Sequence, residues 1–219
     1  MKAAFLSDRG VVKVNGEDAR DFLNGLVTTD VTLLRPGLGR FGALLTPQGK
    51  ITVDFLITEA PDGDGGGFLI DAPRPLTKGL ADKLGFYKLR AKVAVENLSD
   101  SLGVLAVWDG EPSMKPDLSF ADPRNEALGW RILVPEDLKQ KVADLIGADL
   151  VDEEAYEAHR VLTGVSGPEV RAQRCQDQAA RRSGSLFLRG RWSSGPCASV
   201  CIGDRINSPP TFHSPGSSP

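Results

Sequence analysis

The stretch FGALLTPQGKITVDFLITEA, residues 41–60, constrains the fold of this chain more than any other. Its two apolar runs are joined by a Pro-Gln-Gly turn, which predicts a pair of antiparallel strands. The second run alternates, so every other side chain from Ile51 to Ile57 points one way and Asp54 points the other way. Strand interiors disfavour Asp, and a buried unpaired charge is costly. Asp54 therefore faces either water on the polar side of a sheet or a bound ligand, and both interpretations stay open.

Helical and strand patterns interleave on both sides of this hairpin. Asn15 and Asp152 are expected as helix N-caps, and Gly85 and Gly147 as helix ends. Because the strands are connected mainly by hairpins, an α+β fold with a largely antiparallel sheet fits better than a doubly wound fold. The expected helices cover residues 15–27, 75–85, 135–147 and 152–165, and the further expected strands cover residues 10–14, 68–72, 87–97, 101–110 and 129–135.

The expected strand YKLRAKVAVEN, residues 87–97, is amphipathic. One face is apolar, and the other carries Lys88, Arg90 and Lys92. This basic strip is interpreted in two ways. It is either a solvated sheet face or an anion-facing strip suited to a ligand that bears a carboxylate.

The composition changes abruptly after residue 165. Residues 1–165 hold all ten lysines and no cysteine, whereas residues 166–219 hold all three cysteines and no lysine. The last part is rich in Gly, Pro and Ser, and its seven arginines against three acids give it a net charge of +4, which leaves −7 for the rest. Such a segment cannot bury enough apolar surface to offset its ordering entropy. We therefore expect residues 1–165 to form the folded region and residues 166–219 to be a disordered, low-complexity tail.

Several kinds of site are missing from the sequence. It contains no GxxxxGK[ST] motif and no GxGxxG after a strand, which argues against nucleotide triphosphate and dinucleotide sites. His159 is expected to be a packed or surface histidine, and Cys197, Cys201 and His213 lack a fourth metal ligand at a helpful spacing. The Asp-Gly-Asp loop at residues 61–67 fails the calcium-loop pattern and predicts a hairpin tip.

Bulk properties favour a soluble protein. The net charge of −3 gives no electrostatic case for direct nucleic-acid binding or for an anionic membrane. No apolar run reaches the roughly 20 residues that span a bilayer, and the first residues resemble neither a signal peptide nor a transit peptide. A cytoplasmic location is therefore the expectation, with a mitochondrial one as the alternative for a eukaryotic chain.

Five stretches taken together resemble the YgfZ folate-binding family, which is related to the glycine-cleavage T-protein, an aminomethyltransferase. The resemblance implies intertwined ferredoxin-like α/β subdomains around a central folate pocket, followed by a small β-barrel. It also implies a role in assembling or repairing iron–sulfur proteins, with an indirect effect on tRNA modification. The stretches are VNGEDARDFLNGLVTTDV, FGALLTPQGKITVDFLI, FYKLRAKVAVEN, ADPRNEALGWRIL and YEAHRVLTGV.

The same resemblance implies site residues and a ligand. GKITVDFLI is similar to the T-protein stretch whose acidic residue touches folate, so Asp54 is carried over as the residue that orients the nitrogens of tetrahydrofolate. Arg9 and Arg90 are carried over as cations at the pocket edge. The first functional hypothesis is a folate-binding accessory protein with iron–sulfur assembly proteins or clients as partners. The alternatives are a tetrahydrofolate-dependent one-carbon transferase and an inactive fragment.

The chain departs from the family after Val165. The family signature KGCYxGQE, which follows the helix that YEAHRVLTGV begins, has no counterpart here. The likeness stops where lysine vanishes and Arg, Ser, Pro and Cys take over, which favours a change of reading frame or a truncation at this point. On this interpretation the C-terminal β-barrel domain is missing.

Overall fold

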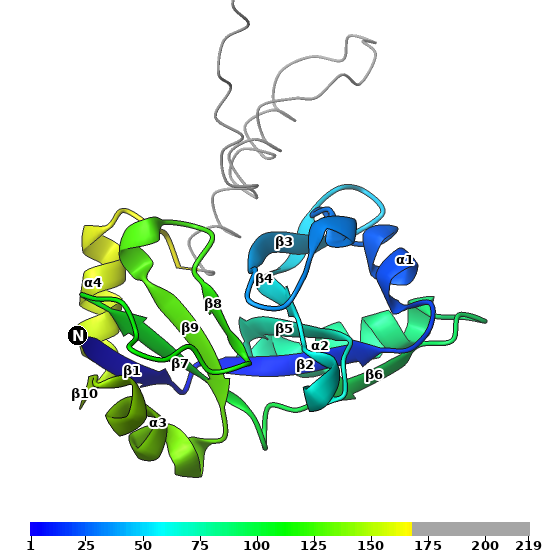
Figure 1. Cartoon of the computed structure of the whole chain (residues 1–219). Coiled ribbons are helices and arrows are strands. Elements are labelled where there is room, and N and C mark those ends of the chain that lie inside the picture. Colours follow the sequence, from blue (N-terminus) through cyan, green and yellow to red (C-terminus); the bar gives the residue numbers. More distant parts are fainter. Residues whose placement is uncertain (168–219) are drawn as a thin grey trace, which may run out of the picture.

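The computed structural model describes residues 1–167 as two five-stranded sheets that lie side by side (Figure 1). Sheet A has the strand order β10-β1-β7-β9-β8, and sheet B has the order β3-β4-β5-β2-β6. Among these residues the pairing of β1 with β10 is parallel, and the other strand pairings are antiparallel. The predicted α+β class with mainly antiparallel sheet is therefore confirmed.

The elements have the following bounds. The strands of sheet A are β1 (Lys2–Leu6), β7 (Gly103–Trp108), β8 (Ser119–Ala121), β9 (Trp130–Val134) and β10 (Asp149–Val151). The strands of sheet B are β2 (Arg9–Asn15), β3 (Arg40–Leu45), β4 (Ile51–Glu59), β5 (Phe68–Pro73) and β6 (Ala94–Asn97). The α-helices are α1 (Ala19–Asn24), α2 (Arg74–Tyr87), α3 (Lys139–Ile146) and α4 (Glu153–Leu162). The short 3-10 helices are η1 (Val31–Leu33), η2 (Asp62–Asp64), η3 (Glu126–Leu128) and η4 (Glu136–Leu138).

The sequence of sheet B is inserted within that of sheet A. The chain leaves sheet A through Ser7 and Asp8, between β1 and β2, and returns through residues 98–102, between β6 and β7. Two short crossings therefore connect the lobes covalently. The two sheets must otherwise be held together by apolar packing and polar contacts where they meet, a region that we call the junction.

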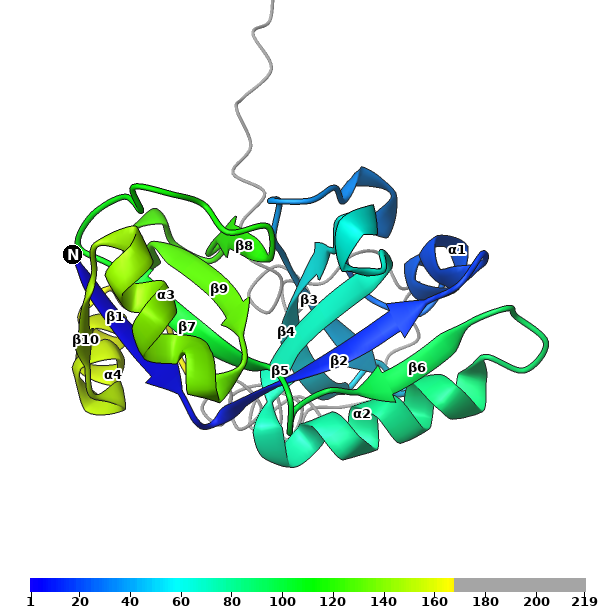
Figure 2. The same ribbon diagram turned by 60° about the horizontal axis from the view of Figure 1, so that its bottom comes forward.

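Three apolar cores explain why the strands are so rich in large aliphatic residues. An outer core lies between sheet B and the helices α1 and α2, and a second outer core lies between sheet A and α3. A central core joins the facing sides of both sheets and includes Leu56, Val11, Trp108 and Tyr156. Because α3 packs in one core of sheet A and Tyr156 of α4 in another, the two helices cover opposite faces of that sheet (Figure 2).

The first helix starts later than the sequence pattern predicts. Asn15, expected as its N-cap, is instead the last residue of β2 and pairs with Ala94 of β6. The chain then turns through Gly16, whose φ of +125° favours a residue without a Cβ, and Asp18 takes the cap position. The Asp18 carboxylate accepts a hydrogen bond from the backbone N–H of Lys92, 2.7 Å away, rather than from the helix.

The expected strand at residues 87–97 is wrong in its first half. Helix α2 continues through Gly85 to Tyr87, and the N–H of Lys88 still donates to the carbonyl of Leu84, so β6 begins only at Ala94. Residues 88–93 form a turn, so Lys88, Arg90 and Lys92 do not share the face of a strand. The alternation of apolar and basic residues wrongly predicted a strand here, because charged side chains are exposed to water in a turn as well as on a sheet face.

Other expectations have mixed outcomes. The hairpin of β3 and β4, the loop at residues 61–67, β7, β9 and the N-cap Asp152 are confirmed, the last by a 3.0 Å bond from the N–H of Ala155. Leu138 and Leu145, two leucines of the expected helix at residues 135–147, are exposed. The sequence analysis missed the strands β1, β8 and β10.

The predictions for the end of the chain are not tested by these elements. The disordered tail, the cysteine thiols and His213 lie almost entirely outside residues 1–167, the part that the structure describes. The domain boundary at residue 165, the change of reading frame and the missing β-barrel likewise stay predictions.

Candidate functional site

Asp54 lies on the side of sheet B that faces sheet A. It is near the middle of β4 and pairs with Ala43 of the edge strand β3. Leu56 points to the same side of β4 and is buried in the central core between the sheets. Asp54 itself is half-buried and interacts with other protein groups. The carboxylate therefore stands at the margin of the junction, next to the short side chain of Ala43.

Arg9 is held by other protein groups. It is the first residue of β2 and is buried. Its Nε donates to Oδ1 of Asp71 at 2.6 Å, and its Nη2 donates to the backbone carbonyl of the same residue at 2.9 Å. A ligand carboxylate at Arg9 would have to compete with this ion pair.

Arg9 is one end of a buried chain of charges, which we call the junction network. The other carboxylate oxygen of Asp71 lies 2.7 Å from Nη1 of Arg131. Arg131 also donates from Nε to Asp122 at 3.0 Å and from Nη2 to the hydroxyl of Tyr156 at 3.0 Å. Asp122 in turn accepts three bonds from Arg124, two from the guanidinium at 2.9 and 2.6 Å and one from the backbone N–H at 3.1 Å. The network comprises Arg9, Asp71, Arg131, Asp122, Arg124 and Tyr156.

The junction network crosses from one sheet to the other. Arg9 and Asp71 belong to sheet B, whereas Arg131 on β9 and Tyr156 on α4 belong to the lobe of sheet A. Burial alone would raise the pKa of Asp122, but the charges and hydrogen bonds of Arg131 and Arg124 outweigh burial and hold this pKa below its usual range. Burial likewise opposes the charge of Arg131, yet Tyr156 and the two carboxylates raise its pKa well above the ordinary value. Asp122 and Arg131 therefore both stay ionised over the physiological pH range.

Such a network makes the relative position of the two sheets specific. Removing one partner of a buried ion pair leaves an uncompensated charge and typically costs about 3–5 kcal/mol. Sliding sheet A past sheet B would separate Asp71 from Arg131 in the same way. The junction-facing side of β4, with Asp54, is thereby held at a fixed place relative to sheet A.

Arg90 lies apart from both Asp54 and Arg9. It is exposed in the turn between α2 and β6, and within residues 1–167 it makes no ion pair. Figures 1 and 2 both show this turn at the end of the lobe that is remote from sheet A. The structure therefore does not bring Arg9 and Arg90 together at one pocket edge beside Asp54.

A second polar cluster lies at the crossing from β1 to β2. The hydroxyl of Ser7 donates to Glu153, in the first turn of α4, at 2.6 Å, and the N–H groups of Ser7 and Asp8 point to the same carboxylate. Burial and the hydrogen bond and charge of Glu153, partly opposed by Arg9, raise the pKa of Asp8 from 3.8 to about 6. Burial would also raise the pKa of Glu153, but the hydrogen bonds from Ser7 and Asp8 lower it. The Asp8 carboxyl therefore keeps its proton to a higher pH than an ordinary aspartate does, at the point where the chain passes between the two sheets.

The described residues offer little support for other chemistry. Residues 1–167 contain no group of three or more His, Cys, Asp or Glu side chains that could hold a metal ion. His159, expected to be a packed or surface histidine, stacks on Trp108 with ring centroids 5.7 Å apart, and its Nε2 lies 2.7 Å from the carbonyl oxygen of Ala127. In the same part of the chain we find no helix with the length and apolar character needed to cross a membrane.

The sequence analysis missed the junction network. Asp71 stands in FLIDAP and Arg131 in GWRILV, and in each case one charge interrupts a run that is otherwise apolar. The same signal drew attention to Asp54, which is only half-buried. One opposite charge in each of two buried strands was the available clue, because buried charges are rarely left unpaired.

Comparisons with known proteins place the chain near one group. No protein-family model matches it. It is 32% identical over 169 residues to "Iron-sulfur cluster assembly factor IBA57 homolog, mitochondrial" of Pyricularia oryzae, an alignment that covers 74% of this chain and 42% of that protein. The protein of that name from Mycosarcoma maydis is 30% identical over 178 residues, covering 75% and 43%. The mouse protein "Iron-sulfur cluster assembly factor IBA57, mitochondrial" is 29% identical, covering 73% and 49%. The chain thus spans less than half of the length of these relatives.

A solved structure agrees on the fold. The glycine cleavage system aminomethyltransferase T from Bartonella henselae superposes with a TM-score of 0.58 at 17% identity, covering 76% of this chain and 52% of that one. At this identity the likeness concerns the fold alone. It agrees with the mixed α+β fold that the resemblance to the glycine-cleavage T-protein implies. The chain is thus similar in sequence, at modest identity, to the IBA57 assembly factors, and it has a mixed α+β fold like that of aminomethyltransferase T.

Proposed function

We propose that this protein is a folate-binding accessory factor that supports the assembly or repair of iron–sulfur clusters. The observation that carries the proposal is the 32% identity to an iron–sulfur cluster assembly factor over 169 residues. Assembly proteins or the iron–sulfur enzymes themselves would be its partners, and an effect on tRNA modification would be indirect, through those enzymes. The names of the relatives include "mitochondrial", which favours the mitochondrial alternative over the cytoplasmic expectation.

Tetrahydrofolate is the proposed ligand, and Asp54 is the residue proposed to hold its pterin end. A half-buried carboxylate can accept hydrogen bonds from the N–H groups of a flat heteroaromatic ring. Ala43 lies beside Asp54, and the Phe41–Leu56 pair follows on the same side of the sheet, so the surroundings offer a small residue and apolar groups for the ring faces. These features fit a pterin, which the protein would bind and orient, while the one-carbon chemistry belongs to the folate.

The roles proposed for the two arginines differ in their support. Arg9 would have to contact folate while it is bound to Asp71, and Arg90 would have to contact folate from the exposed turn after α2. Both are kept as proposed contacts of the glutamate end of folate, but Asp54 is the residue on which the proposal depends. A one-carbon transferase of the aminomethyltransferase type stays the alternative, and the likeness to aminomethyltransferase T supports it only at the level of the fold.

Calorimetric titration of the full chain with tetrahydrofolate tests the ligand. We expect Asp54→Asn to weaken binding about fivefold to tenfold, which corresponds to about 1.0–1.4 kcal/mol. The melting temperature should change little, because Asn keeps the shape of the half-buried side chain. Asp137→Asn, at an exposed aspartate in η4, is the matched control and should bind like the unaltered protein. If both variants bound tetrahydrofolate with equal affinity, Asp54 would have no role in binding the ligand.

A second experiment separates the accessory role from turnover. The full chain is expressed in fungal cells that lack their own IBA57 factor, and the activities of iron–sulfur enzymes are measured. Recovery of these activities, together with folate binding but no transfer of a methylene group in vitro, is the expected result. Transfer with turnover would establish the alternative, and failure of both recovery and binding would leave an inactive fragment.

A further inference from the structure

The turn between α2 and β6 projects from the end of the sheet B lobe. Figures 1 and 2 show it extending past the helices and strands around it. We call residues 86–92, at its apex, the tip. The tip is held in shape by several hydrogen bonds, including those from the N–H of Ala91 to the carbonyl of Lys88 at 2.7 Å and from the N–H of Lys92 to Asp18 at 2.7 Å. It is therefore a fixed projection.

The tip carries large apolar side chains into solvent. Leu89 is 85% exposed and Phe86 is 76% exposed, and Phe86 makes an edge contact with the ring of Tyr87. Leu89 has a φ of +43°, a conformation that is unfavourable for a residue with a Cβ. Nothing within the described lobe covers these groups, so the fold presents them outward at a cost in stability.

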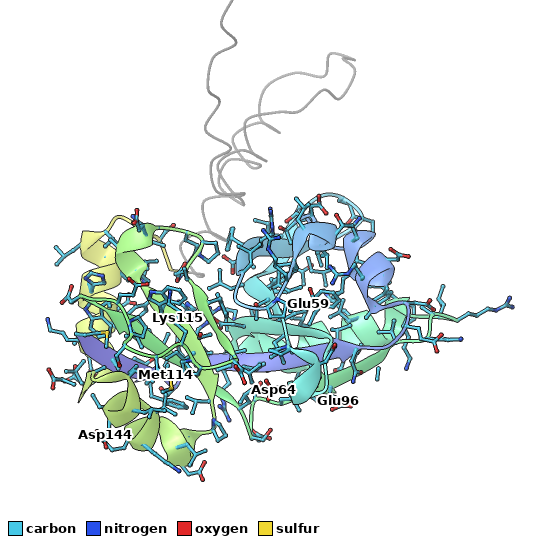
Figure 3. The ribbon with its side chains drawn as sticks, in the orientation of Figure 1. Glu59, Asp64, Glu96, Met114, Lys115 and Asp144 are labelled. Carbon is cyan, nitrogen blue, oxygen red and sulfur yellow. The ribbon has the colours of Figure 1, made fainter. Side chains whose placement is uncertain are left out.

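The tip is also the most basic stretch of the folded region. Between Asp82 and Glu96 the sequence contains Lys83, Lys88, Arg90 and Lys92 and no acidic residue. Lys92 pairs with Glu17, but Arg90 forms no ion pair within residues 1–167. Glu96 lies back along β6, on the side of the main body (Figure 3). The net charge of the whole chain conceals this local excess of positive charge.

We propose that the tip binds the surface of a membrane that contains anionic phospholipids. Exposed Phe and Leu side chains flanked by Lys and Arg are the arrangement that inserts into the headgroup region, where the cations meet lipid phosphates. A stable protein interface needs about 800 Å² from each partner, which a narrow convex turn of seven residues supplies poorly. A lipid surface needs only a few inserted side chains. Glu17 and Asp18 contact the tip at Lys92, so the cations left for the lipid phosphates are Lys88 and Arg90, which form no ion pair within residues 1–167.

Binding at the tip does not require folate. It needs neither Asp54 nor the assembly partners, and Arg90, which is also a proposed folate contact, would take part through its charge alone. The two proposals can therefore fail separately, since folate binding is measured without lipid and membrane binding without folate.

Sedimentation of the purified full chain with lipid vesicles tests the proposal. Vesicles of phosphatidylcholine alone are compared with vesicles of phosphatidylcholine mixed with cardiolipin, at low and high salt. We expect the chain to sediment with the anionic vesicles only and less at high salt. Phe86→Ser combined with Leu89→Asn should weaken binding about tenfold or more. Asn tolerates the positive φ at position 89, so this variant should keep its melting temperature.

Leu33→Ser combined with Leu145→Ser removes two leucines that are each 54% exposed elsewhere, and it should bind as the unaltered chain does. Absence of binding to either vesicle would overturn the proposal, and so would equal binding to both. Binding that survives in the Phe86 and Leu89 variant would also overturn it, because another segment, such as the arginine-rich residues 168–219, would then carry the affinity. A loss that is confined to the tip variant and restricted to anionic vesicles is the supporting result.

Discussion

The junction between the sheets and the tip use charged residues in opposite ways. At the junction, Asp71 and Arg131 are nearly inaccessible to solvent, and each is bound by at least two partners. At the tip, Arg90 is exposed without an ion pair among the described residues, beside two apolar side chains that water also reaches. Charges that are fully matched inside the protein fix its shape, whereas charges left in water are available to an external partner.

This difference teaches where substitutions act. A buried charge that loses its partner keeps its desolvation penalty, so the effect appears in the free energy of unfolding. An exposed charge loses little stability when it is changed, because water already solvates it. The junction is therefore expected to respond in stability and the tip in binding.

Asp71→Ala should have the largest effect on stability. Both Arg9 and Arg131 lose their shared carboxylate, and two buried guanidinium groups then face each other without it. We expect the free energy of unfolding, measured by urea titration, to fall by about 3–5 kcal/mol. That is a large part of the roughly 5–15 kcal/mol that a domain usually has.

Asp100→Asn is the matched control for that change. Asp100 pairs with Arg74 at 3.0 Å but is fully exposed at the surface. Its removal should cost less than about 1 kcal/mol. Similar losses for both variants would show that the junction network holds the sheets no better than a surface ion pair does.

Tyr156→Phe should have an intermediate effect. The ring keeps its edge contact with Trp108, at 5.4 Å, but Nη2 of Arg131 loses its acceptor. An unsatisfied buried donor costs about 1–3 kcal/mol, which urea titration resolves. Tyr87→Phe removes a hydroxyl at the tip that is not part of the junction network. Its free energy of unfolding should stay within about 0.5 kcal/mol of that of the unaltered protein. Equal losses at the two tyrosines would remove the distinction between the junction and the tip.

The elements that the sequence predicted best are those whose local signals agree with the tertiary structure. The β3–β4 hairpin has alternating side chains and a turn, and α4 has Asp152 at its start. Residues 87–97 failed because the alternation of apolar and basic residues fits a helix end and a turn as well as it fits a strand. The short strands β1, β8 and β10 are formed by pairing with partners far along the chain, which no local pattern records.

The candidate site was predicted less completely than the fold. Asp54 was singled out because a carboxylate in a strand is unusual, and its role in a site stays a prediction; the structure gives it a half-buried position at the junction margin. Asp71 and Arg131 carry the same signal, but their pairing was not predicted. They are 60 residues apart in sequence and meet only because the two sheets pack against each other through the central core. Long-range pairing of charges is a property of the packed structure.

Asp8→Asn should have the smallest effect, and it depends on pH. The raised pKa of Asp8, about 6 against 3.8, means that the folded protein holds a proton which the unfolded chain has already released between these values. The stability that this proton contributes is complete below pH 3.8 and is lost as the pH rises through about 6. The pH dependence of stability that arises from Asp122 has the opposite sign. Its pKa is lowered, so its contribution to stability is present above the usual pKa of aspartate and is lost as the pH falls.

Asparagine at position 8 cannot titrate but can still donate a hydrogen bond to Glu153. The variant should therefore lose less stability than the unaltered protein as the pH rises between 3.8 and 6. Urea midpoints measured across this interval test the expectation, with Asp137→Asn, at an exposed site in η4, as the control. The difference is small because Asp8 lies at the surface. An identical slope for both proteins would mean that protonation of Asp8 contributes nothing to the stability of the crossing between the two sheets.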